Sequence, residues 1–337
     1  MKLKIKFIQK TLEGILIKHG FSKPESKTLM EEYLEGELQG KKSHGIAAFS
    51  SYLIKYEDQY AKRKATFKIV RETDSYVFVD ARQTRGVITG REIADVLIKK
   101  AQRSGVALGL IKNMKSWLRP GSIAQCIARK KFVAIVTNTG GRPMMAPPGG
   151  YQPAIGTNPI GIGIPTKNEP LVVDMATSVR AWGTVRDALR DGSLLPDNAF
   201  LDSAGNVTKD PKKAFAAMPA GDVKGFALGL LIEVLCGSLV DMPMGQEMSR
   251  VFKESQYALS LRGGMILVIN PSFSTSSSKF VKANSKLFDE IRKSKLRQGA
   301  KEILIPGNRA NATRKRNVKA GFLEVDKSVW DEIQALA

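Results

Sequence analysis

The sequence predicts an α/β protein with a helical N-terminal part, and two observations lead to this prediction. Apolar residues recur at helical spacing from residue 5 to residue 38, whereas short runs rich in β-branched and aromatic residues begin at about residue 67. Helical or turn-like segments separate these runs, which is typical of an α/β core. A chain of 337 residues with 43% hydrophobic residues has enough apolar material for two or three domains.

The helical part is expected to contain three helices in succession. Apolar residues share one face over residues 5–19, and a second helix opens at Lys23 and reaches Leu38. Ser43 is the expected N-cap of a third, shorter helix that continues through residues 49–53.

The α/β core is expected from residue 67 onward. The first two strands resemble a strand pair, and two later strands flank a helix as in a βαβ unit. Residues 140–166 are expected to form a loop dense in glycine and proline, residues 224–240 one buried helix, and the serine-rich residues 272–278 a loop. The strands are expected at residues 67–70, 76–81, 106–111, 132–139, 171–177 and 265–271, and further helices at 90–102, 123–131, 282–299 and 330–336.

The formal net charge of +21 and the isoelectric point near 9.9 raise the question of nucleic-acid binding. Lysines are nevertheless scattered through every region, and the one dense basic stretch runs from Arg292 to Lys319. A solvated face, or a site for an anionic small ligand such as a nucleotide, would use the same charges. We therefore expect a small-molecule substrate and no nucleic-acid partner.

The two cysteines, Cys126 and Cys236, lie in apolar surroundings without a CxxC motif or clustered histidines. We expect neither a disulfide framework nor a metal site, and a reducing, cytoplasmic compartment. Residues 1–10 alternate lysine with apolar residues, unlike a secretory signal. The longest apolar segment, Phe226 to Cys236, is about half as long as a membrane span and contains Glu233. No membrane anchor is expected.

His44 is one of two histidines in the chain and lies in the small turn Ser43-His44-Gly45. An imidazole titrates at about pH 6.5, so it can exchange a proton near neutral pH. His44 is therefore the first candidate for acid–base chemistry, and the alternative is a helix cap or a surface residue.

Other candidate residues follow from position rather than from a common motif. The sequence contains no phosphate loop, no metalloprotease or serine hydrolase motif, and no GxGxxG dinucleotide fingerprint after the first strand. Thr157 and Asn158 lie in a glycine-rich segment that suits a polar ligand held against main-chain N–H groups, or an ordinary turn. Asp174 follows a strand, where α/β proteins place ligand groups or a helix cap. Lys224 precedes the apolar helix, where its ammonium group is expected either to bind a phosphate or carboxylate or to be solvated.

Taken together, these segments resemble one family over nearly the whole chain, the malate/L-lactate dehydrogenase type 2 oxidoreductases, whose members also include ureidoglycolate and sulfolactate dehydrogenases, diketogulonate reductase and cyclic-imine carboxylate reductases. The motifs that carry the resemblance are SHG at 43–45, VTNTGG at 136–141, APPGGYQPAIGTNPIGIGIPT at 146–166, VVDMATSVRAWG at 172–183, KDP at 209–211, VKGFALGLLIEVL at 223–235 and ILIPGN at 303–308.

The resemblance implies a non-Rossmann, mixed-sheet oxidoreductase fold with a helical N-terminal part, and a homodimer. It implies a helical domain at residues 1–70, joined by 285–337, and a cofactor-binding domain at 71–284. It also implies that NAD or NADP carries hydride to a 2-oxo acid, ketone or cyclic imine, with His44 as proton donor and Ser43 as its orienting partner. The other site residues implied are Asp174 as a catalytic carboxylate, Thr157 and Asn158 as substrate contacts, and Met175, Ala176, Lys224, Gly225, Pro306, Gly307 and Asn308 as cofactor contacts.

The chain departs from the family pattern where the family usually binds the substrate carboxylate. Ala48 stands at the position of an arginine that makes a bidentate contact in the family. Arg119, Arg142 and Arg180 lie inside or beside matched motifs, and Arg180 is the replacement that we expect.

Two histidines of the family pattern are also missing, because Ser116 and Gly264 stand at their positions. The neighbouring Trp117 forms either an aromatic wall for a bulkier substrate or part of the core. The departures keep an alternative open: a catalytically altered member that binds a dinucleotide or an anionic macromolecular partner. The basic side chains after the ILIPGN motif, which could bind an NADP 2′-phosphate, are Arg309, Arg314, Lys315 and Arg316.

Overall fold

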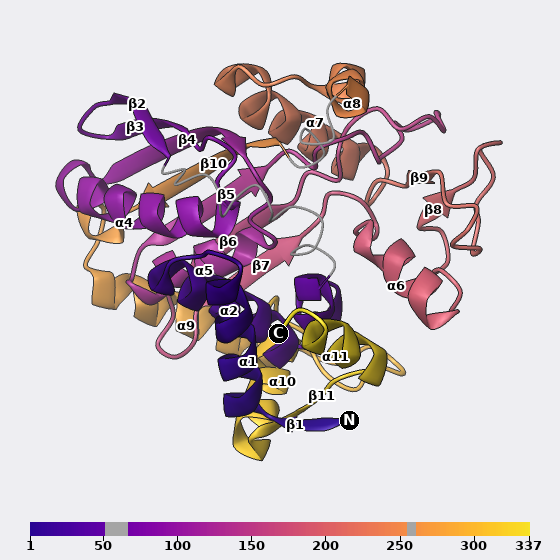
Figure 1. Cartoon of the computed structure of the whole chain (residues 1–337). Helices are drawn as coiled ribbons and strands as arrows, with labels where there is room; N and C mark the ends of the chain where they lie inside the picture. Colours follow the sequence, from indigo (N-terminus) through magenta and orange to yellow (C-terminus); the bar gives the residue numbers. More distant parts are fainter. Residues whose placement is uncertain (51–66, 255–260) are drawn as a thin grey trace. The chain divides into compact units, whose positions relative to one another are not determined.

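The computed structural model describes residues 1–50, 67–254 and 261–337, which divide into two compact units (Figure 1). The described residues of unit 1 fall within Met1–Ala65, Pro165–Leu171 and Thr275–Ala337, and those of unit 2 within Thr66–Ile164 and Val172–Ser274. These bounds lie close to the expected ones but add residues 165–171 to the helical part. That the two parts are separate domains stays a prediction.

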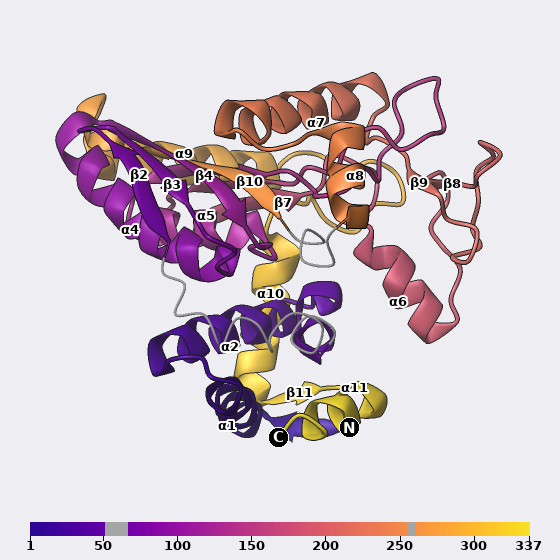
Figure 2. The ribbon, with the colours of Figure 1, turned by 45° about the horizontal axis from the view of Figure 1, so that its top comes forward.

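Unit 1 brings the beginning and the end of the chain together. The strand β1 (Lys2–Lys4) pairs antiparallel with β11 (Phe322–Glu324), and the amino group of Met1 donates to the carbonyl of Val325 at 2.7 Å. Figure 2 shows this strand pair beside α11 (Lys327–Gln334). The described start of unit 1 is therefore held by its end.

The first two expected helices are confirmed. Helix α1 (Ile5–Lys18) buries an apolar stripe that includes Ile8 and Leu12. Helix α2 (Lys23–Leu38) starts at a capping box, in which the Ser22 hydroxyl and the Glu25 carboxylate each accept from the other residue's backbone N–H.

The C-terminal helices of unit 1 differ from the expectation. Helix α9 (Ser277–Arg292) begins inside the serine-rich stretch expected as a loop, because the Ser276 hydroxyl caps it by accepting from the N–H of Lys279 at 3.2 Å. The next helix, α10 (Asn308–Ala320), was not expected, because its polar sequence shows no apolar stripe. Its Arg314 Nε lies 2.8 Å from Glu35 Oε1 of α2.

Unit 2 is built on a seven-stranded mixed sheet in the order β2-β3-β4-β10-β5-β6-β7. β3 and β4 run parallel, β2 runs antiparallel to β3, β10 is antiparallel to both β4 and β5, and β5 is antiparallel to β6. The mixed-sheet prediction is therefore confirmed. The strands are β2 (Lys68–Glu72), β3 (Tyr76–Asp80), β4 (Val106–Met114), β5 (Val133–Asn138), β6 (Ile160–Ile164), β7 (Leu171–Met175) and β10 (Arg262–Ile269).

The strand pairing corrects the expected βαβ unit. Helix α5 (Pro120–Arg129) does connect β4 and β5, but β10 lies between these two strands. The adjacent parallel pair is instead β3 and β4, which helix α4 (Gly86–Ser104) connects.

One strand lies in the segment that we expected to be an irregular loop. β6 contains Gly161 and Gly163, and a Cβ at these positions would lie 2.4 Å from the carbonyl carbon of Pro120 and 2.2 Å from the carbonyl oxygen of Ala124. The glycines therefore allow this strand to lie directly against α5. Glycine in a strand often marks such a close approach.

The expectation of one buried helix over residues 224–240 is wrong in two respects. Helix α7 (Val223–Cys236) ends earlier and is followed by the 3₁₀ turn η2 (Ser238–Val240). One side of α7 is also exposed, with Leu230 47% and Leu231 54% accessible. Figure 2 shows α7 on one face of the sheet and α4 and α5 on the other.

By length and composition alone, Val223–Val240 is also long and apolar enough to cross a membrane, with a mean hydropathy of 1.9. Core helices of soluble proteins pass the same test, so this is weak evidence. Glu233 of α7 accepts hydrogen bonds from Asn158 and Gly245 inside unit 2, as in a core helix. Unit 2 further contains α6 (Gly183–Asp191), β8 (Phe200–Leu201), β9 (Ala216–Ala217), α8 (Gly245–Glu254) and η4 (Pro271–Phe273).

Candidate active site

The candidate proton donor lies in a short 3₁₀ turn of unit 1, η1 (Lys42–His44). The Ser43 hydroxyl and His44 Nδ1 are 3.0 Å apart, and both side chains are partly exposed. A hydroxyl at Nδ1 orients the imidazole ring, and it can donate to Nδ1 or accept from it. The structure thus brings together two of the three residues expected to be catalytic.

The expectation that Ser43 caps the following helix is wrong. Ser43 lies inside η1, the next helix begins at Ile46, and the Ser43 hydroxyl contacts His44 instead. Part of the helix expected through residues 49–53 lies outside the described residues.

The cap is supplied by Glu37 of α2, which sequence reasoning missed. Its Oε2 accepts from the N–H of Ile46 at 3.0 Å, and the residue is 8% exposed. A Cβ at Gly45 would lie 2.3 Å from Glu37 Oε2, and one at Gly36 would lie 2.5 Å from the His44 carbonyl oxygen. Helix α2 and the His44 turn are therefore in direct contact. A signal existed in the sequence, because Glu37 lies on the same helix face as the apolar residues Tyr33 and Leu34.

In unit 2, Asn158 lies at the centre of a hydrogen-bond network. Its amide nitrogen donates to the Gly229 carbonyl at 2.8 Å and to Glu233 Oε2 at 2.7 Å, and its oxygen accepts from the N–H of Gly140 at 2.7 Å. The residue is fully buried at a φ of 28°. The asparagine amide therefore joins two loops to α7. Its expected contact with substrate stays a prediction.

Thr157 connects this loop to the motif that follows β7. Its carbonyl accepts from both the N–H and the hydroxyl of Thr177, at 3.0 and 3.1 Å. A Cβ at Gly225 would lie 2.6 Å from the Thr177 carbonyl oxygen, so the first turn of α7 approaches the same point. The structure thus brings the neighbourhoods of Thr157, Asn158 and Gly225 together. Met175 and Lys224 are exposed and Ala176 is half-buried beside them.

Asp174 lies near the end of β7, as expected for a ligand-binding group of an α/β protein. Its Oδ1 accepts from the N–H of Gly121 at 3.2 Å, at the start of α5. A Cβ at Gly121 would lie 2.4 Å from the Asp174 Cβ, so only glycine allows this approach. A helix N-terminus favours a negative charge. The carboxylate therefore lies at the beginning of the preceding helix rather than of the next one.

The arginines considered as replacements for the missing carboxylate clamp differ in exposure. Arg180 is exposed, and its carbonyl accepts from the Ser178 hydroxyl at 2.8 Å. Arg119 is 3% exposed at the start of α5, and the guanidinium of Arg142 lies 6.0 Å from the centre of the Trp182 ring. Among the described residues, Arg119 is thus buried and Arg142 lies beside an aromatic ring, whereas Arg180 is exposed and has no such ring contact.

Trp117 is a core residue. It is completely buried, and its indole N–H donates to the Asn138 side chain. A Cβ at Gly264 would lie 2.8 Å from the indole ring. Gly264 is one of the two positions at which the chain lacks an expected histidine. The indole ring of Trp117 therefore occupies the space that a side chain at this position would need.

The cofactor motif of unit 1 lies at the start of α10. Gly307 is the N-cap residue, with a φ of 86°, a left-handed conformation that glycine adopts without strain. Pro306 and Asn308 line a cavity of about 690 Å³ within unit 1. Of the basic residues that follow, Arg309, Lys315 and Arg316 line the cavity, whereas Arg314 does not. Pro306 and Asn308 are thus at the edge of one hollow, and Gly307 lies between them in the sequence.

Metal and thiol chemistry find no support in the part of the chain that the structure describes. No group of three or more histidine, cysteine, aspartate or glutamate side chains there is placed to hold a metal ion. Burial and the nearby Glu233 raise the pKa of the Cys236 thiol, so this cysteine is neutral and weakly nucleophilic near pH 7.

Comparison with known proteins gives the family. The malate/L-lactate dehydrogenase family matches residues 3–334. The chain is 30% identical to L-sulfolactate dehydrogenase of Methanocaldococcus jannaschii over 100% of this chain and 96% of the relative. It is 28% identical to ureidoglycolate dehydrogenase (NAD(+)) of Escherichia coli, covering 97% and 93% of the two chains.

Other relatives extend the range of reactions and confirm the fold. The chain is 28% identical to a Δ¹-pyrroline-2-carboxylate/Δ¹-piperideine-2-carboxylate reductase of Pseudomonas putida, covering 85% and 84% of the two chains. The crystal structure of malate dehydrogenase from Entamoeba histolytica superposes with a TM-score of 0.92 at 22% identity, over 100% of this chain and 97% of that one. The chain therefore belongs to the malate/L-lactate dehydrogenase family and is an enzyme of the dehydrogenase and reductase type.

Proposed function

We propose that this enzyme reduces a 2-oxo acid, ketone or cyclic imine with NADH or NADPH, and that His44 donates the proton. The observation that carries the proposal is the 3.0 Å contact between the Ser43 hydroxyl and His44 Nδ1, in a turn that Glu37 holds from α2. With Nδ1 oriented by the hydroxyl, Nε2 is the nitrogen that would protonate the developing alkoxide or amine. Such a positioned general acid contributes about 10²–10⁴-fold to a rate.

We propose contacts for a nicotinamide cofactor in each unit by itself. In unit 2, the exposed Met175 and Lys224 flank the close approach of Gly225 to Thr177. In unit 1, Pro306 and Asn308 line the cavity beside α10, and Gly307 lies between them in the sequence. We propose these residues as its contacts, together with Ala176. When bound, the cofactor supplies the hydride.

We place Asp174 on the cofactor side of the site. Its Oδ1 accepts a hydrogen bond from the N–H of Gly121, so the carboxylate holds the backbone at the start of α5 against β7. Thr157 and Asn158 connect their loop to Thr177 and to Glu233 of α7. The exposed Arg180 is the proposed contact for the substrate carboxylate.

Arg180 would compensate for the alanine at position 48, which is 3% exposed and offers no charge. The names of the relatives set the substrate range of the proposal: 2-hydroxy acids for the sulfolactate dehydrogenase and a cyclic imine for the reductase.

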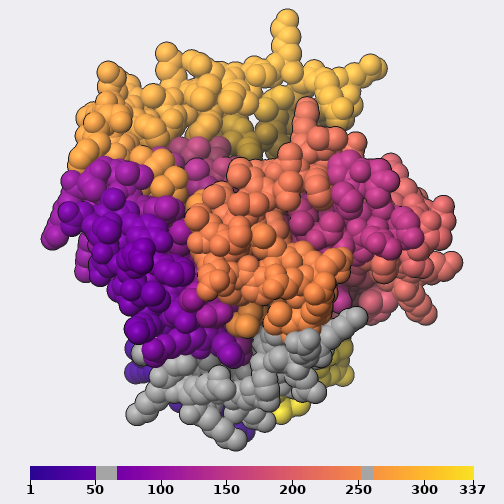
Figure 3. Space-filling model, turned by 90° about the horizontal axis from the view of Figure 1, so that it is seen from above, coloured from indigo at the N-terminus to yellow at the C-terminus, as the bar shows by residue number. Residues whose placement is uncertain are grey.

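We further propose a homodimer in the cytoplasm. The outer side of α7 exposes Val223, Leu230, Leu231 and Val234, which are each 44% or more accessible. Figure 3 views unit 2 from the side of α7 and α8, whose coral and orange surface lies uncovered in this view. An exposed apolar patch of this kind is typical of a protein interface. Neither Cys126 nor Cys236 forms a disulfide in the described residues, which agrees with a reducing compartment.

The test of this proposal uses the two histidines of the chain. Oxidation of NADPH and of NADH is followed by absorbance with pyruvate, oxaloacetate, sulfopyruvate and Δ¹-piperideine-2-carboxylate as substrates. His44→Ala is expected to lower kcat by roughly 10²–10⁴-fold and to leave cofactor affinity within about twofold.

The matched control is His19→Ala, because His19 lies at the C-terminal end of α1 and is also partly exposed. This variant is expected to retain full turnover. Turnover of His44→Ala equal to the wild type would remove the histidine from the mechanism. Absence of cofactor binding by the wild type would refute the reductase itself.

A further inference from the structure

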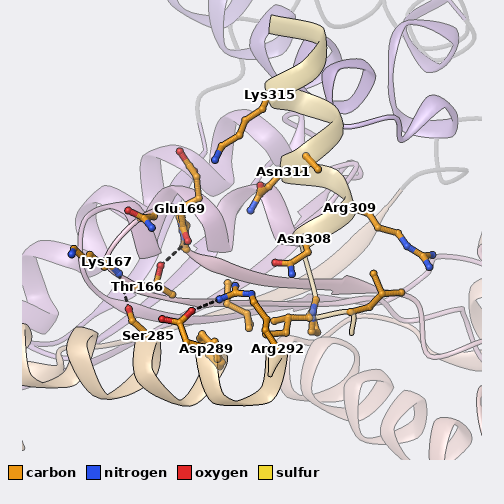
Figure 4. A pocket seen from close by; sticks show the side chains of 18 of the residues that line it. Thr166, Lys167, Glu169, Ser285, Asp289, Arg292, Asn308, Arg309, Asn311 and Lys315 are labelled. Carbon is orange, nitrogen blue, oxygen red and sulfur yellow. Dashed lines mark hydrogen bonds and ion pairs between the residues drawn. The ribbon is translucent and has the colours of Figure 1, made fainter. Parts of the chain in front are cut away.

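The lining of the cavity in unit 1 contains apolar side chains and a basic, amide-rich side, which Figure 4 shows on α10. Its volume of about 690 Å³ is in the range of small-molecule sites, about 300–1,000 Å³. The loop 166–171, the second half of α9, residues 302–306 and the first turns of α10 contribute to it. Leu171, Phe288 and Leu304 provide apolar contact area of the kind that a planar base requires.

The basic, amide-rich side is one stripe of α10. Asn308, Asn311 and Lys315 are spaced i, i+3 and i+7, so they share a helix face. Figure 4 shows Asn311 and Lys315 pointing into the hollow and Arg309 pointing to the other side of the helix. The ammonium group of Lys315 and the two amides therefore present hydrogen-bond donors to the same space.

Ion pairing shows which of the surrounding cations are already neutralised. Arg292 Nη1 lies 2.7 Å from Asp289 Oδ1, and Arg314 is paired with Glu35. No ion pair engages Lys315 in the ranges 1–50, 67–254 and 261–337. Lys167 and Arg316 add further positive charge to the lining, against the carboxylates of Glu169 and Glu302. The lining thus has a surplus of positive charge.

We propose that this cavity binds the phosphorylated adenosine half of the cofactor, and that Lys315 selects NADPH over NADH by binding the 2′-phosphate. The inference rests on the proposed function, because it concerns the same cofactor. A phosphate monoester carries about −1.5 to −2 charges near pH 7, which the ammonium group neutralises. NADH has a hydroxyl at that position and gains nothing from Lys315. A carboxylate is the group that suits the ribose hydroxyl of NAD, and Glu169 is outnumbered here by the cations of the lining.

The first experiment measures dissociation constants of NADPH and NADH by nicotinamide fluorescence. The wild type is expected to bind NADPH at least tenfold tighter than NADH. Lys315→Gln is expected to weaken NADPH binding about tenfold and to leave NADH binding within about twofold. Lys319→Gln is the matched control, because Lys319 lies on the same helix outside the cavity lining. It is expected to change neither constant.

Two outcomes of this experiment would overturn the inference while the proposed reductase stands. One is equal binding of NADPH and NADH by the wild type, and the other is a Lys315→Gln variant with unchanged NADPH affinity. Glu169→Gln gives an independent sign: tighter NADPH binding supports the inference, and weaker NADH binding with unchanged NADPH binding contradicts it. Failure of the wild type to bind either dinucleotide refutes the proposed function as well.

A competition experiment separates the cofactor from a free nucleotide. Adenosine 2′,5′-bisphosphate is expected to displace NADPH from the wild type at least tenfold better than 5′-AMP, and to lose this advantage in Lys315→Gln. Binding of the bisphosphate without displacement of NADPH would assign the cavity to a free nucleotide and overturn the inference. A decrease of affinity with salt that is steeper for NADPH than for NADH would agree with a contact to the 2′-phosphate.

Discussion

The turn that carries His44 is held by a side chain outside the Ser-His-Gly motif. Glu37 is buried on α2, and its carboxylate bonds the first N–H of the helix that follows the turn. The glycines at 36 and 45 allow the two backbones to approach at this point. Proton transfer depends on the position of the donor to within a fraction of an ångström. Glu37 is therefore a positioning residue for the proposed general acid.

Glu37→Gln keeps the shape of the side chain and removes its charge. The bond to the Ile46 N–H weakens, so we expect kcat to fall roughly tenfold at unchanged cofactor affinity. Stability is expected to fall by about 1 kcal/mol, because a charged acceptor is replaced by a neutral one. Steady-state kinetics and thermal unfolding measure the two effects. Glu31→Gln on the same helix serves as the control, and equal losses in both variants would reduce Glu37 to a general contributor to α2.

At the residue scale, rarity and motif identified some candidate residues, and the geometry identified others. His44 stood out as one of two histidines, and its partner Ser43 was its neighbour in sequence. The Asn158–Glu233 bond joins residues far apart in the chain, so no local pattern contains it. The same holds for Glu37, whose acceptor role depends on how tightly α2 meets the turn.

At the scale of elements, contact between β6 and α5 depends on glycine. Gly163→Ala would place a Cβ 2.2 Å from the Ala124 carbonyl oxygen, so strand and helix must separate. We expect a destabilisation of about 1–3 kcal/mol, as for other overpacked interiors. Gly14→Ala in α1, where a Cβ meets nothing within 4 Å, is expected to stabilise by about 0.5–1 kcal/mol. Urea denaturation followed by circular dichroism measures the change in the free energy of unfolding for both variants. An unchanged free energy of unfolding for Gly163→Ala would contradict the close approach.

The elements that sequence reasoning missed share physical causes. Helix α10 is polar because it contacts α2 through an ion pair and a hydrogen bond from a side-chain amide rather than through an apolar stripe. Strand β6 is rich in glycine because it packs directly against a helix. Strand β10 pairs with β4 and β5, which are far from it in the sequence. The residues of a single strand do not specify which strands it will pair with. The amphipathic α1 and α2 were predictable because their burial follows a local period.

At the scale of the whole molecule, the exposed side of α7 predicts self-association. Leu231→Glu is expected to convert a dimer to a monomer at micromolar concentration, because each copy would bury a charge in place of about 1.5–3 kcal/mol of apolar contact. Sedimentation equilibrium measures the mass. Leu194→Glu is the control, since Leu194 is 72% exposed but lies away from α7 in the sequence. A Leu231→Glu protein with the wild-type mass would exclude this side as the interface.

Unit 1 is built from segments that are far apart in the sequence, because β1 pairs with β11 and α2 is ion-paired with α10. During synthesis, α1 and α2 therefore precede their partners α10 and β11 by most of the described sequence. We expect α1 and α2 to remain without these partners while unit 2 is synthesised between them. A nascent chain stalled before residue 308 would lack the helix that anchors α2. The surroundings of the His44 turn are thus expected to be complete only after α10 has been synthesised.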